Sequence, residues 1–398
     1  MTSNRLLKAL DLAAFWAVAH VLRVFSWLLW VLSPRWRRAT VDPAPVRSVL
    51  VIKLCCLGDG LLAVPAIRAL KAHFAQARLT VLCTRRNDAV FESLPYVDEL
   101  VRLEVTGIGG LQELLWTGPR DLWRVIRRIR ARHPDVAVDL DLYYRITPVL
   151  AFLAGAPVRA GFDTASQRRG TLLTHKVARE RNRHELECFL HVVAAIGVQP
   201  VGTDLEFGIR PEHEERARRL LDEVGLDGAR ILALFPGSSR NWPVKQWPAE
   251  RFAEVADRLA RQHGLRPLIL GAPYEKHIAE QVAAHMTTPA AVAAGRTDVK
   301  ALAAVLKRCT LLVSNDTGPM HLAAAVGLPV VGIFGMTNER KWRPWGEQHE
   351  VVVGRCERRP CYYLSNMPRC EHLQCIREIA VDDVCAAAER VLARGGIS

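Results

Sequence analysis

Several common nucleotide-binding and nucleic-acid-binding signatures are missing from this chain of 398 residues. The glycine turn at 58–60 lacks the G-x-G-x-x-G pattern of dinucleotide-binding folds, and it has no P-loop lysine at the required spacing. Neither NAD nor ATP binding is therefore indicated. The chain also has no aromatic RNA-binding signature, no zinc-finger spacing and no basic heptad region, so nucleic acid is not an expected partner.

Acidic residues are in deficit. The chain has 41 Asp and Glu against 54 Lys and Arg, which gives a net charge of +13. This excess of positive charge indicates an anionic partner, and an acidic lipid surface and a phosphorylated small molecule both fit. Many of the arginines lie in the stretch 120–132. They form either a solvated helix face or an anion-binding surface, and charge alone does not distinguish the two.

A long uninterrupted apolar run is also missing. Residues 6–32 are rich in Trp and Leu, but Asp11, His20 and Arg23 interrupt them. A membrane-spanning helix needs about 20 apolar residues in succession. The residues 33–36 that follow offer no small-residue cleavage site of the kind that ends a secretory signal. The stretch is therefore a poor match to a signal peptide or to a clean span.

The same stretch has the composition of a helix that lies on a membrane surface. Its apolar residues are flanked by basic ones, which suits an anionic cytoplasmic leaflet, with Trp27 and Trp30 at headgroup depth. We therefore expect residues 1–43 to form a membrane-associating helix and a basic segment. A true membrane span is the alternative.

The ten cysteines do not have the pattern of a secreted disulfide framework. The chain is large, and Cys55, Cys56, Cys83 and Cys309 lie within apolar strand or helix patterns. We expect a reducing cytoplasm as the compartment of the folded protein.

Strand and helix patterns alternate from residue 48 onward. Strand 48–54, helix 61–74 and strand 79–83 form a β-α-β unit, and the first half continues in the same way to a predicted turn at residues 161–163. Proline, glycine and charge near 200–210 indicate a boundary, after which a second alternating series begins. We expect an α/β protein of two facing Rossmann-like, doubly wound domains. The expected domains are residues 44–208 and residues 209–398.

Each half has a strand that ends in a glycine turn with an aspartate. In the first half this residue is Asp59, and in the second half it is Asp316. Ligands of open α/β sheets bind at the carboxyl ends of the strands, so we expect both turns to face one cleft. Asp59 is a candidate general base for an attacking hydroxyl, and a helix N-cap is its structural alternative.

A phosphate site is predicted in the second half. Ser238 and Ser239 lie in a Pro-Gly-Ser-Ser loop after a strand, and Lys245 supplies a positive charge shortly after them. At the second turn, Thr317 is placed to cap a helix whose N-terminus attracts anions. A carboxylate repels phosphate, so we expect Asp316 to accept hydrogen bonds from sugar hydroxyls or from its own loop.

Together these residues resemble the bacterial heptosyltransferases of glycosyltransferase family 9, inverting GT-B enzymes that build the lipopolysaccharide inner core. The resemblance covers about residues 48–392, and its most specific part is SNDTGPMHLAAA at 314–325. It implies a GT-B fold, here with an N-terminal hydrophobic helix. It also implies single displacement at the anomeric carbon of a sugar donor such as ADP-heptose. No cofactor is expected for catalysis, because the family needs no metal for this step.

The resemblance also implies roles for individual residues. Asp59 is similar to the family's catalytic base, and Lys245 to its diphosphate-binding lysine. Glu275 resembles the carboxylate that holds the nucleotide ribose, and Thr297 falls in the segment beside the adenosine. The expected donor-binding residues are Ser238, Ser239, Lys245, Glu275, Thr297, Asp316, Thr317, Gly318 and His321.

On the acceptor side the chain departs from the family pattern. Asp141 stands where relatives usually carry a glutamine. Relatives usually have Gly-Asp-Val here, followed by a histidine two residues on. In this chain the aspartate is instead followed by Gly60, Leu61 and Leu62. These departures leave the acceptor and the donor sugar open. Arginines are expected to hold the carboxylates or phosphates of the acceptor, and the candidates are Arg85, Arg86, Arg124, Arg127, Arg128 and Arg145.

Four cysteines near the C-terminus have the spacing C-x4-C-x8-C-x4-C, with His372 between the last two. Zinc sites usually have about two to four residues within each cysteine pair, so this spacing is loose. Clustered cysteines also occur in relatives of the family. A structural metal and reduced thiols that pack a loop both remain open. The candidate metal ligands are Cys356, Cys361, Cys370 and Cys375.

The predicted function is transfer of a heptose or related sugar from a nucleotide diphosphate donor to an anionic glycolipid, the lipopolysaccharide core. The expected location is the cytoplasmic face of the inner membrane. A first alternative is another GT-B glycosyltransferase, which uses a different nucleotide sugar for a cell-surface glycan. A second is a non-catalytic nucleotide-sugar-binding or membrane scaffold protein. That protein would be expected to have lost Asp59 or Lys245, and both are present.

Overall fold

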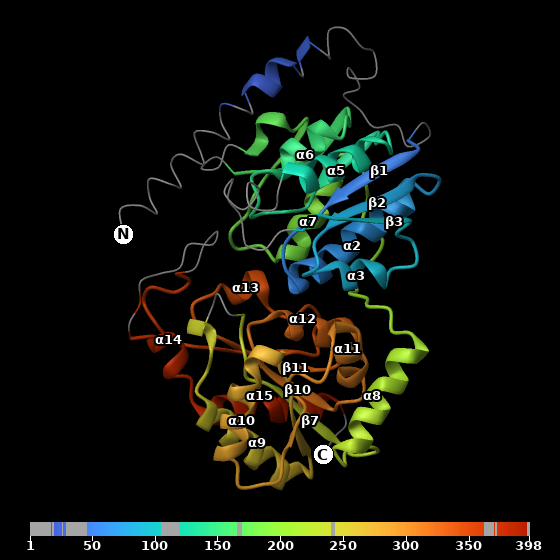
Figure 1. Cartoon of the computed structure of the whole chain (residues 1–398). Helices are drawn as coiled ribbons and strands as arrows, with labels where there is room; N and C mark the ends of the chain where they lie inside the picture. Colours follow the sequence, from blue (N-terminus) through green and yellow to red (C-terminus); the bar gives the residue numbers. More distant parts are fainter. Residues whose placement is uncertain are drawn as a thin grey trace. The chain divides into compact units, whose positions relative to one another are not determined.

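The computed structural model of the chain describes residues 17, 20–25, 27–28, 46–104, 119–164, 169–239, 243–361, 370 and 372–395. The chain divides into two compact units, Met1–Thr203 (unit 1) and Asp204–Ser398 (unit 2), shown in Figure 1. Each unit has its own six-stranded sheet, and all the strand pairs described in the two sheets are parallel. Parallel strands need crossover connections, which here are mostly helical, and the expected α/β class is confirmed.

The strands of unit 1 are β1 (Ser48–Ile52), β2 (Arg78–Cys83), β3 (Glu99–Arg102), β4 (Val136–Asp139), β5 (Val158–Asp163) and β6 (His175–Ala178). Their order across the sheet is β3-β2-β1-β4-β5-β6. The chain adds β2 and β3 on one side of β1, and then crosses over to add β4 on the other side. This reversal between β1 and β4 is the kind of switch point at which open α/β sheets bind ligands.

Helices cover both faces of this sheet. Val125 of α5 (Pro119–Arg130) and Leu150 of α6 (Thr147–Leu153) pack with Leu50 and Ile52 in one buried cluster. Helix α2 (Leu57–His73) packs against α7 (Glu185–Ala194), and neither helix contributes to that cluster, so these two cover the opposite face. The shorter elements are α3 (Asp88–Glu92) and the 3-10 turn η2 (Arg169–Leu172).

The strands of unit 2 are β7 (Ile231–Phe235), β8 (Arg266–Ile269), β9 (Ala291–Val292), β10 (Leu311–Asn315), β11 (Val330–Phe334) and β12 (Glu350–Val353). Their order is β12-β11-β10-β7-β8-β9. Counted from β7, this is the same order as in unit 1 counted from β1. The switch point of unit 2 therefore lies between β7 and β10.

The helices of unit 2 also form two layers. Phe252 of α9 (Ala249–His263) and Leu392 of α15 (Val381–Arg394) pack in one cluster with Leu232 and Val313 of the sheet. Helix α8 (Pro211–Glu223) packs against α11 (Val299–Lys307) outside that cluster. The other helices and 3-10 turns are η3 (Pro243–Lys245), η4 (Pro273–Glu275), α10 (Lys276–His285), α12 (Gly318–Ala325), α13 (Glu339–Trp342) and α14 (Gln374–Arg377).

The start of α2 differs from the expectation. This helix begins at Leu57 rather than at residue 61, so Gly58 and Gly60 lie in its first turn instead of forming a loop before it. Glycine at position 60 allows close packing, because a Cβ there would lie 3.2 Å from the Cβ of Asn87. Gly60 thus lets the first turn of the helix pack close to the loop that holds Asn87, and it does not form a turn before the helix.

A second local expectation is also wrong. Residues 161–163, predicted as a turn, form the end of β5. Gly161 pairs with Asp139 of β4, and a Cβ at this glycine would lie 3.0 Å from the Cβ of that aspartate. The missing side chain makes room for a buried carboxylate beside the strand, which is a packing requirement rather than a chain reversal.

The part of the expected N-terminal helix that is described is helical at residues 20–25 and 27–28, whereas Trp30 lies outside the described residues. Leu22 packs against a small apolar cluster that includes Phe152 of α6. Among the described residues, no helix combines the length and the apolar character needed to cross a membrane. The exposed apolar side chains of this segment are Val21, Val24, Phe25, Trp27 and Leu28.

A buried ion pair fixes the carboxyl end of β4. Arg169 Nη2 lies 2.8 Å from Asp139 Oδ2, and both side chains are fully buried. The same nitrogen donates to the carbonyl oxygen of Asp141 and to the hydroxyl of Thr147, each at 2.8 Å. This arginine therefore joins η2 to the residues that follow β4.

We predict that Arg169→Met lowers the free energy of unfolding by roughly 3–5 kcal/mol, because it leaves the Asp139 carboxylate buried without its cation. Urea unfolding followed by circular dichroism measures this loss. The control is Arg78→Met, whose half-exposed guanidinium lies 3.3 Å from Glu99 and should contribute about 1 kcal/mol or less. Equal losses of unfolding free energy in the two variants would show that the buried ion pair stabilises the fold no more than the exposed one.

Candidate active site

Several of the sequence-predicted site residues lie at the switch points of the two sheets. In unit 1, Asp59 follows β1, and Asp141 and Arg145 follow β4. In unit 2, the loop with Ser238 follows β7, and Asp316 follows β10. Each pair of loops comes from neighbouring strands that run in the same direction, so the strand order brings the two loops together.

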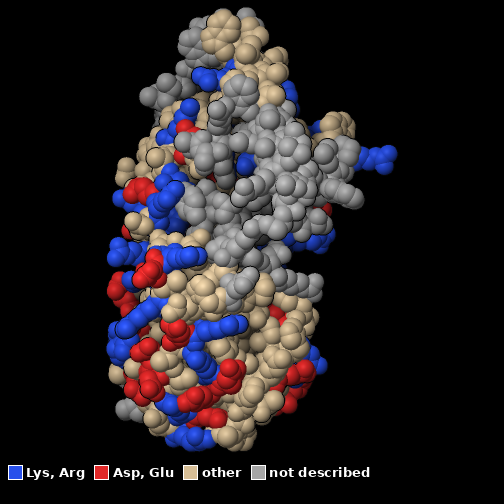
Figure 2. All heavy atoms as spheres, turned by 90° about the vertical axis from the view of Figure 1, so that its left-hand side faces the viewer, with Lys and Arg blue, Asp and Glu red and all other residues tan. Residues whose placement is uncertain are grey.

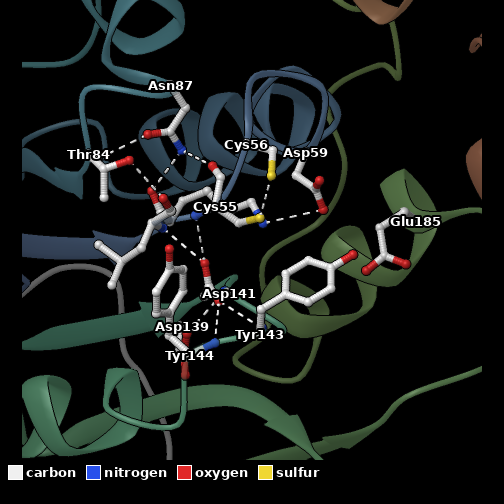
Figure 3. A network of polar contacts seen from close by, with 12 residues as sticks. Cys55, Cys56, Asp59, Thr84, Asn87, Asp139, Asp141, Tyr143, Tyr144 and Glu185 are labelled. Carbon is white, nitrogen blue, oxygen red and sulfur yellow. Dashed lines mark hydrogen bonds and ion pairs between the residues drawn. The ribbon is translucent and has the colours of Figure 1, made fainter. Parts of the chain in front are cut away.

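In unit 1 the two loops are joined by one carboxylate, Asp141 (Figure 3). Its Oδ2 accepts the backbone N–H groups of Leu54 and Cys55, both at 3.0 Å, from the loop after β1. Its Oδ1 accepts those of Tyr143 and Tyr144 at 2.8 and 3.0 Å. Asp141 is therefore occupied by the backbone of the site.

Asp59 lies in the first turn of α2, and Cys56 is the N-cap residue of that helix. The Asp59 side chain is 12 % exposed, and its Oδ1 lies 3.7 Å from Lys53 Nζ. Burial raises the pKa of Asp59 to about 6 against the opposing effect of Lys53, and the carboxylates of Glu185 and Asp141 add to the rise. A carboxylate whose pKa lies near neutrality suits a general base.

Lys53 is a fully buried cation that the sequence reasoning missed. Its ammonium lies 3.7 Å from Asp59 and 4.9 Å from the centre of the Phe189 ring. Burial favours the neutral amine, but Asp59, Asp141 and the other nearby acids raise the pKa of Lys53 above its usual value. The signal in the sequence that could have identified Lys53 is a lysine at the end of an apolar strand pattern.

In unit 2, Lys245 and Asp316 form an ion pair, with 2.7 Å between Nζ and Oδ2. Both side chains are largely buried. The lysine comes from η3 and the aspartate from the loop after β10, so the pair joins the two loops of this switch point. The pair also offsets part of the negative charge that Asp316 would present to a phosphate.

Asn315 joins the same loops without a charge. Its Oδ1 accepts the backbone N–H of Trp247 at 3.2 Å, and its Nδ2 donates to the carbonyl oxygen of Pro236 at 2.7 Å and to that of Gly237 at 3.3 Å. Asn315 belongs to the family-like SNDTG segment, but the sequence reasoning gave it no role. A polar residue that ends a buried strand was the signal.

The N-terminus of α12 is arranged as expected only in part. Thr317 is the N-cap residue, but its side chain makes no capping hydrogen bond; its hydroxyl donates to the carbonyl oxygen of Asn315 at 3.2 Å. The first turn therefore presents N–H groups that the Thr317 side chain does not cover. Ser238 is buried, Ser239 is exposed, and His321 is buried within α12.

Glu275 lies against the loop after β7. Its Oε2 accepts the backbone N–H of Ala272 at 2.7 Å, and burial raises the pKa of Glu275 above its usual value. A Cβ at Gly237 would lie 2.4 Å from this carboxyl group, so glycine is required for the close approach. Thr297 is half-buried in the loop between β9 and α11.

The candidate acceptor arginines are spread over unit 1. Arg85 and Arg86 follow β2 and Arg145 follows β4, whereas Arg127 and Arg128 lie on α5. Loops after β2 and β4 are at the carboxyl edge of the sheet, next to the loop that leads to α2. Arg124 also lies on α5, so the structure places three of the six candidates at the edge that carries Asp59.

Acidic side chains pair with some of these arginines. Arg85 Nε lies 2.9 Å from Glu104, and Arg128 Nε lies 3.0 Å from Glu99. Arg128 belongs to a group around Glu99 that holds α5 against β3. A solvated, salt-bridged helix face therefore describes this part of the arginine-rich stretch.

The C-terminal cysteines lie near one another. The pKa of the Cys375 thiol is raised to about 11, first by burial and then by the thiols of Cys361, Cys356 and Cys370. The Cys370 sulfur lies 3.5 Å from Nε2 of His372. Residues 362–369 and 371 of this segment lie outside the described residues. A metal at these thiols stays a prediction.

A family model described as glycosyltransferase family 9 (heptosyltransferase) matches residues 122–368, more than half of the chain. The chain belongs to glycosyltransferase family 9. It is therefore a glycosyltransferase, and the resemblance noted in the sequence is confirmed at the level of the family.

Individual relatives of this family agree with that membership. The lipopolysaccharide core heptosyltransferase OpsX of Haemophilus influenzae is 24% identical over 310 residues, which cover 77% of this chain and 84% of that protein. The crystal structure of a family 9 glycosyl transferase from Veillonella parvula has 25% identity and a TM-score of 0.74, covering 90% of this chain and 100% of that one. E. coli heptosyltransferase WaaC with ADP has 18% identity and a TM-score of 0.64, covering 86% and 99%. The GT-B fold expected for the two units is thereby confirmed.

We predict that Lys53→Met raises the pKa of Asp59 above about 6, because the ammonium that opposes the effect of burial is removed. Carboxyl carbon NMR titration of the full chain, with the signal assigned through Asp59→Asn, measures this shift. Lys71→Met is the control, since its ammonium pairs with Asp98 at 3.3 Å toward the other end of α2. The charge assignment is wrong if the pKa stays near 6 or falls in Lys53→Met.

Proposed function

We propose that this family 9 glycosyltransferase moves a heptose from ADP-heptose to a sugar hydroxyl of the lipopolysaccharide core, with inversion at the anomeric carbon. The observation that carries the proposal is the setting of Asp59. It is a nearly buried carboxylate on a glycine-flanked helix start, with its pKa raised to about 6. The names of the relatives supply the substrates, since they include a lipopolysaccharide core heptosyltransferase and a heptosyltransferase with ADP.

In the proposed reaction, Asp59 removes the proton from the acceptor hydroxyl as the oxygen attacks the anomeric carbon. The bond from that carbon to the diphosphate oxygen breaks at the same time, and the nucleotide diphosphate leaves on the opposite side. Lys53 keeps part of the Asp59 population ionised near neutral pH, because its charge favours the carboxylate.

Unit 2 is proposed to hold the donor. The ammonium of Lys245 and the N-terminus of α12 would stabilise the charge that develops on the departing diphosphate. Ser238, Ser239 and Gly318 line the same switch point as hydrogen-bond donors. Glu275, held by the Ala272 N–H, is proposed to accept the ribose hydroxyls. Thr297 and His321 complete the proposed donor site.

The acceptor is proposed to bind along the carboxyl edge of the sheet of unit 1. Arg86 and Arg145 lie in the loops after β2 and β4, the strands on either side of β1, and are proposed to hold the anionic groups of the acceptor. Arg85, Arg127 and Arg128 are proposed as outer contacts.

The membrane surface is proposed as the place of action, on the cytoplasmic side. In the lower half of Figure 2, over unit 2, blue and red side chains alternate, and no large patch of one sign is seen among the described residues of this face. Exposed ion pairs such as Arg258 with Asp382 are of this kind. The apolar side chains at residues 21–28, with Arg23 between them, are the better candidate for membrane contact.

We predict that Asp59→Asn lowers turnover by roughly 10²–10⁴-fold while donor affinity changes little, since the base acts on the acceptor proton. Lys245→Met should instead weaken donor affinity as well as turnover. Purified full-length protein, ADP-heptose and a lipopolysaccharide core acceptor are used, with donor binding followed by calorimetry. In the unmodified enzyme, turnover should rise with pH through about 6, because the base works only when deprotonated.

Matched controls are Glu180→Gln and Lys276→Met, which alter exposed side chains of units 1 and 2. Near-normal turnover of Asp59→Asn would show that Asp59 is not the general base. Binding of UDP- or GDP-sugars in preference to ADP-sugars would replace the proposed donor and favour the alternative GT-B glycosyltransferase. Donor binding without any transfer would favour the non-catalytic alternative.

We predict that Phe25→Asp with Trp27→Asp weakens binding to vesicles rich in phosphatidylglycerol by about tenfold or more, because two exposed apolar side chains no longer enter the interface. Co-sedimentation of the full chain measures this binding. The control is Val201→Asp, an exposed apolar residue far from the N-terminal segment in sequence. Equal vesicle binding by all three proteins, or unchanged membrane association after deletion of residues 1–40, would contradict the anchor.

A further inference from the structure

Two adjacent cysteines lie beside the proposed base, and the proposed mechanism does not use them. The sulfur atoms of Cys55 and Cys56 are 2.8 Å apart. In the part of the chain that is described, these two sulfurs and a carboxylate oxygen of Asp59 form the one group of metal-ligand type, all within 4.8 Å of one another. Figure 3 shows Cys56 and Asp59 side by side at the start of α2.

The two thiols differ in surroundings. Cys56 is partly exposed and is the N-cap residue of α2, where the positive end of the helix favours a thiolate. The hydrogen bond from Cys55 lowers the pKa of Cys56 against its burial, and Lys53 acts in the same direction. Cys55 is buried, and burial raises the pKa of its thiol. The pair thus joins a partly exposed thiol of lowered pKa to a buried thiol of raised pKa.

The backbone of Cys55 is held in place. Its N–H donates to Asp141 Oδ2 at 3.0 Å, and its carbonyl oxygen accepts a hydrogen bond from Asn87 Nδ2 at 2.5 Å. Cys56 is tied to the helix instead, because its carbonyl oxygen accepts the N–H of Gly60 at 3.0 Å. Cys55 therefore belongs to the fixed loop, and Cys56 belongs to the start of α2.

Charge favours thiol chemistry over metal binding at this group. The Lys53 ammonium lies 3.7 Å from the Asp59 oxygen, so a cation bound by the three ligands would face a buried positive charge. The same charge stabilises a thiolate. A low-pKa, accessible cysteine next to a second cysteine is the arrangement of a redox-sensing pair.

We propose that Cys55 and Cys56 are a peroxide-sensitive thiol pair, and that their reversible disulfide inactivates the enzyme by displacing Asp59. The inactivation part rests on the proposed role of Asp59 as the base. The oxidant is a hydroperoxide, with hydrogen peroxide as the simplest member of the class.

The chemistry has two steps. The Cys56 thiolate attacks one oxygen of hydrogen peroxide, the O–O bond breaks, and the departing hydroxide takes a proton to form water, which leaves Cys56 as a sulfenic acid. The Cys55 sulfur then attacks the Cys56 sulfur, the S–O bond breaks, and a second water leaves with the Cys55 proton. In sum, two thiols lose two electrons and two protons, and one peroxide is reduced to two waters.

Covalent geometry links this bond to Asp59. Adjacent Cα atoms are about 3.8 Å apart, which is shorter than the usual separation of about 4.4–6.8 Å across a disulfide. That separation is fixed by the peptide bond, so the eight-membered ring of this disulfide forms only with changed torsion angles at Cys55 and Cys56. Because Cys55 is held by Asp141 and Asn87, the change falls on Cys56 and the first turn of α2. Asp59 is in that turn. Such a strained disulfide is also readily reduced, which makes the change reversible.

The experiment treats reduced, full-length protein with hydrogen peroxide, removes the peroxide with catalase, alkylates the remaining thiols and digests with trypsin. Cleavage after Lys53 and Arg68 releases residues 54–68, which contain Cys55 and Cys56 and no other cysteine. The expected peptide is lighter by two hydrogen atoms and carries no alkyl group. Dithiothreitol should restore two alkylation sites.

Turnover is measured on portions of the same samples taken before alkylation and digestion. It should fall in proportion to the fraction of the disulfide peptide, by up to about 10²-fold as for loss of a general base, and should return with dithiothreitol. Cys56→Ser should keep the turnover of the reduced enzyme and resist peroxide, since serine suits an N-cap. Cys309→Ser, a partly buried cysteine of unit 2, should respond to peroxide like the unmodified protein.

The peptide mass does not depend on activity, so the two hypotheses fail separately. A fully alkylated 54–68 peptide after peroxide treatment would overturn the thiol pair and leave the glycosyltransferase mechanism untouched. Formation of the disulfide without loss of turnover would overturn the switch. Equal inactivation of Cys56→Ser would assign the peroxide effect to other residues. A normal turnover of Asp59→Asn would instead count against the base.

Discussion

One buried carboxylate holds the site of unit 1 together. Asp141 accepts four backbone N–H groups, two from the loop after β1 and two from the loop after β4. Buried N–H groups without acceptors are costly, so these loops depend on it. A glutamine at this position would have one acceptor oxygen and could not replace both carboxylate oxygens. An aspartate here therefore has a structural role in this chain.

Unit 2 meets the same constraint with a neutral side chain. Asn315 bonds the backbone on both sides of the switch point, accepting from Trp247 and donating to Pro236 and Gly237. These hydrogen bonds add no charge where a diphosphate is proposed to bind. The charge there comes from Lys245 and Asp316, which partly cancel each other, and from the N-terminus of α12.

Lys53 connects catalysis with the thiol pair in unit 1. Its buried ammonium keeps the pKa of Asp59 from rising further, and the same charge lowers the pKa of the Cys56 thiol. The proposed base and the proposed thiol pair thus depend on one cation. Both lie at the start of α2, which is why oxidation of the pair is proposed to displace Asp59.

The sequence by itself determined the α/β alternation, the two halves, and the candidate site residues Asp59, Lys245 and Asp316, because these features depend on local periodicity and on the segments that follow strands. It misassigned Gly60 and Gly161, where the absent side chain serves contact with a distant segment. Only the tertiary structure decided that the loop after β1 meets the loop after β4, that Lys245 pairs with Asp316, and that Lys53 lies under Asp59. The physical reason is that strand order and burial arise from hydrogen bonds and packing between residues far apart in the chain, which no local pattern records.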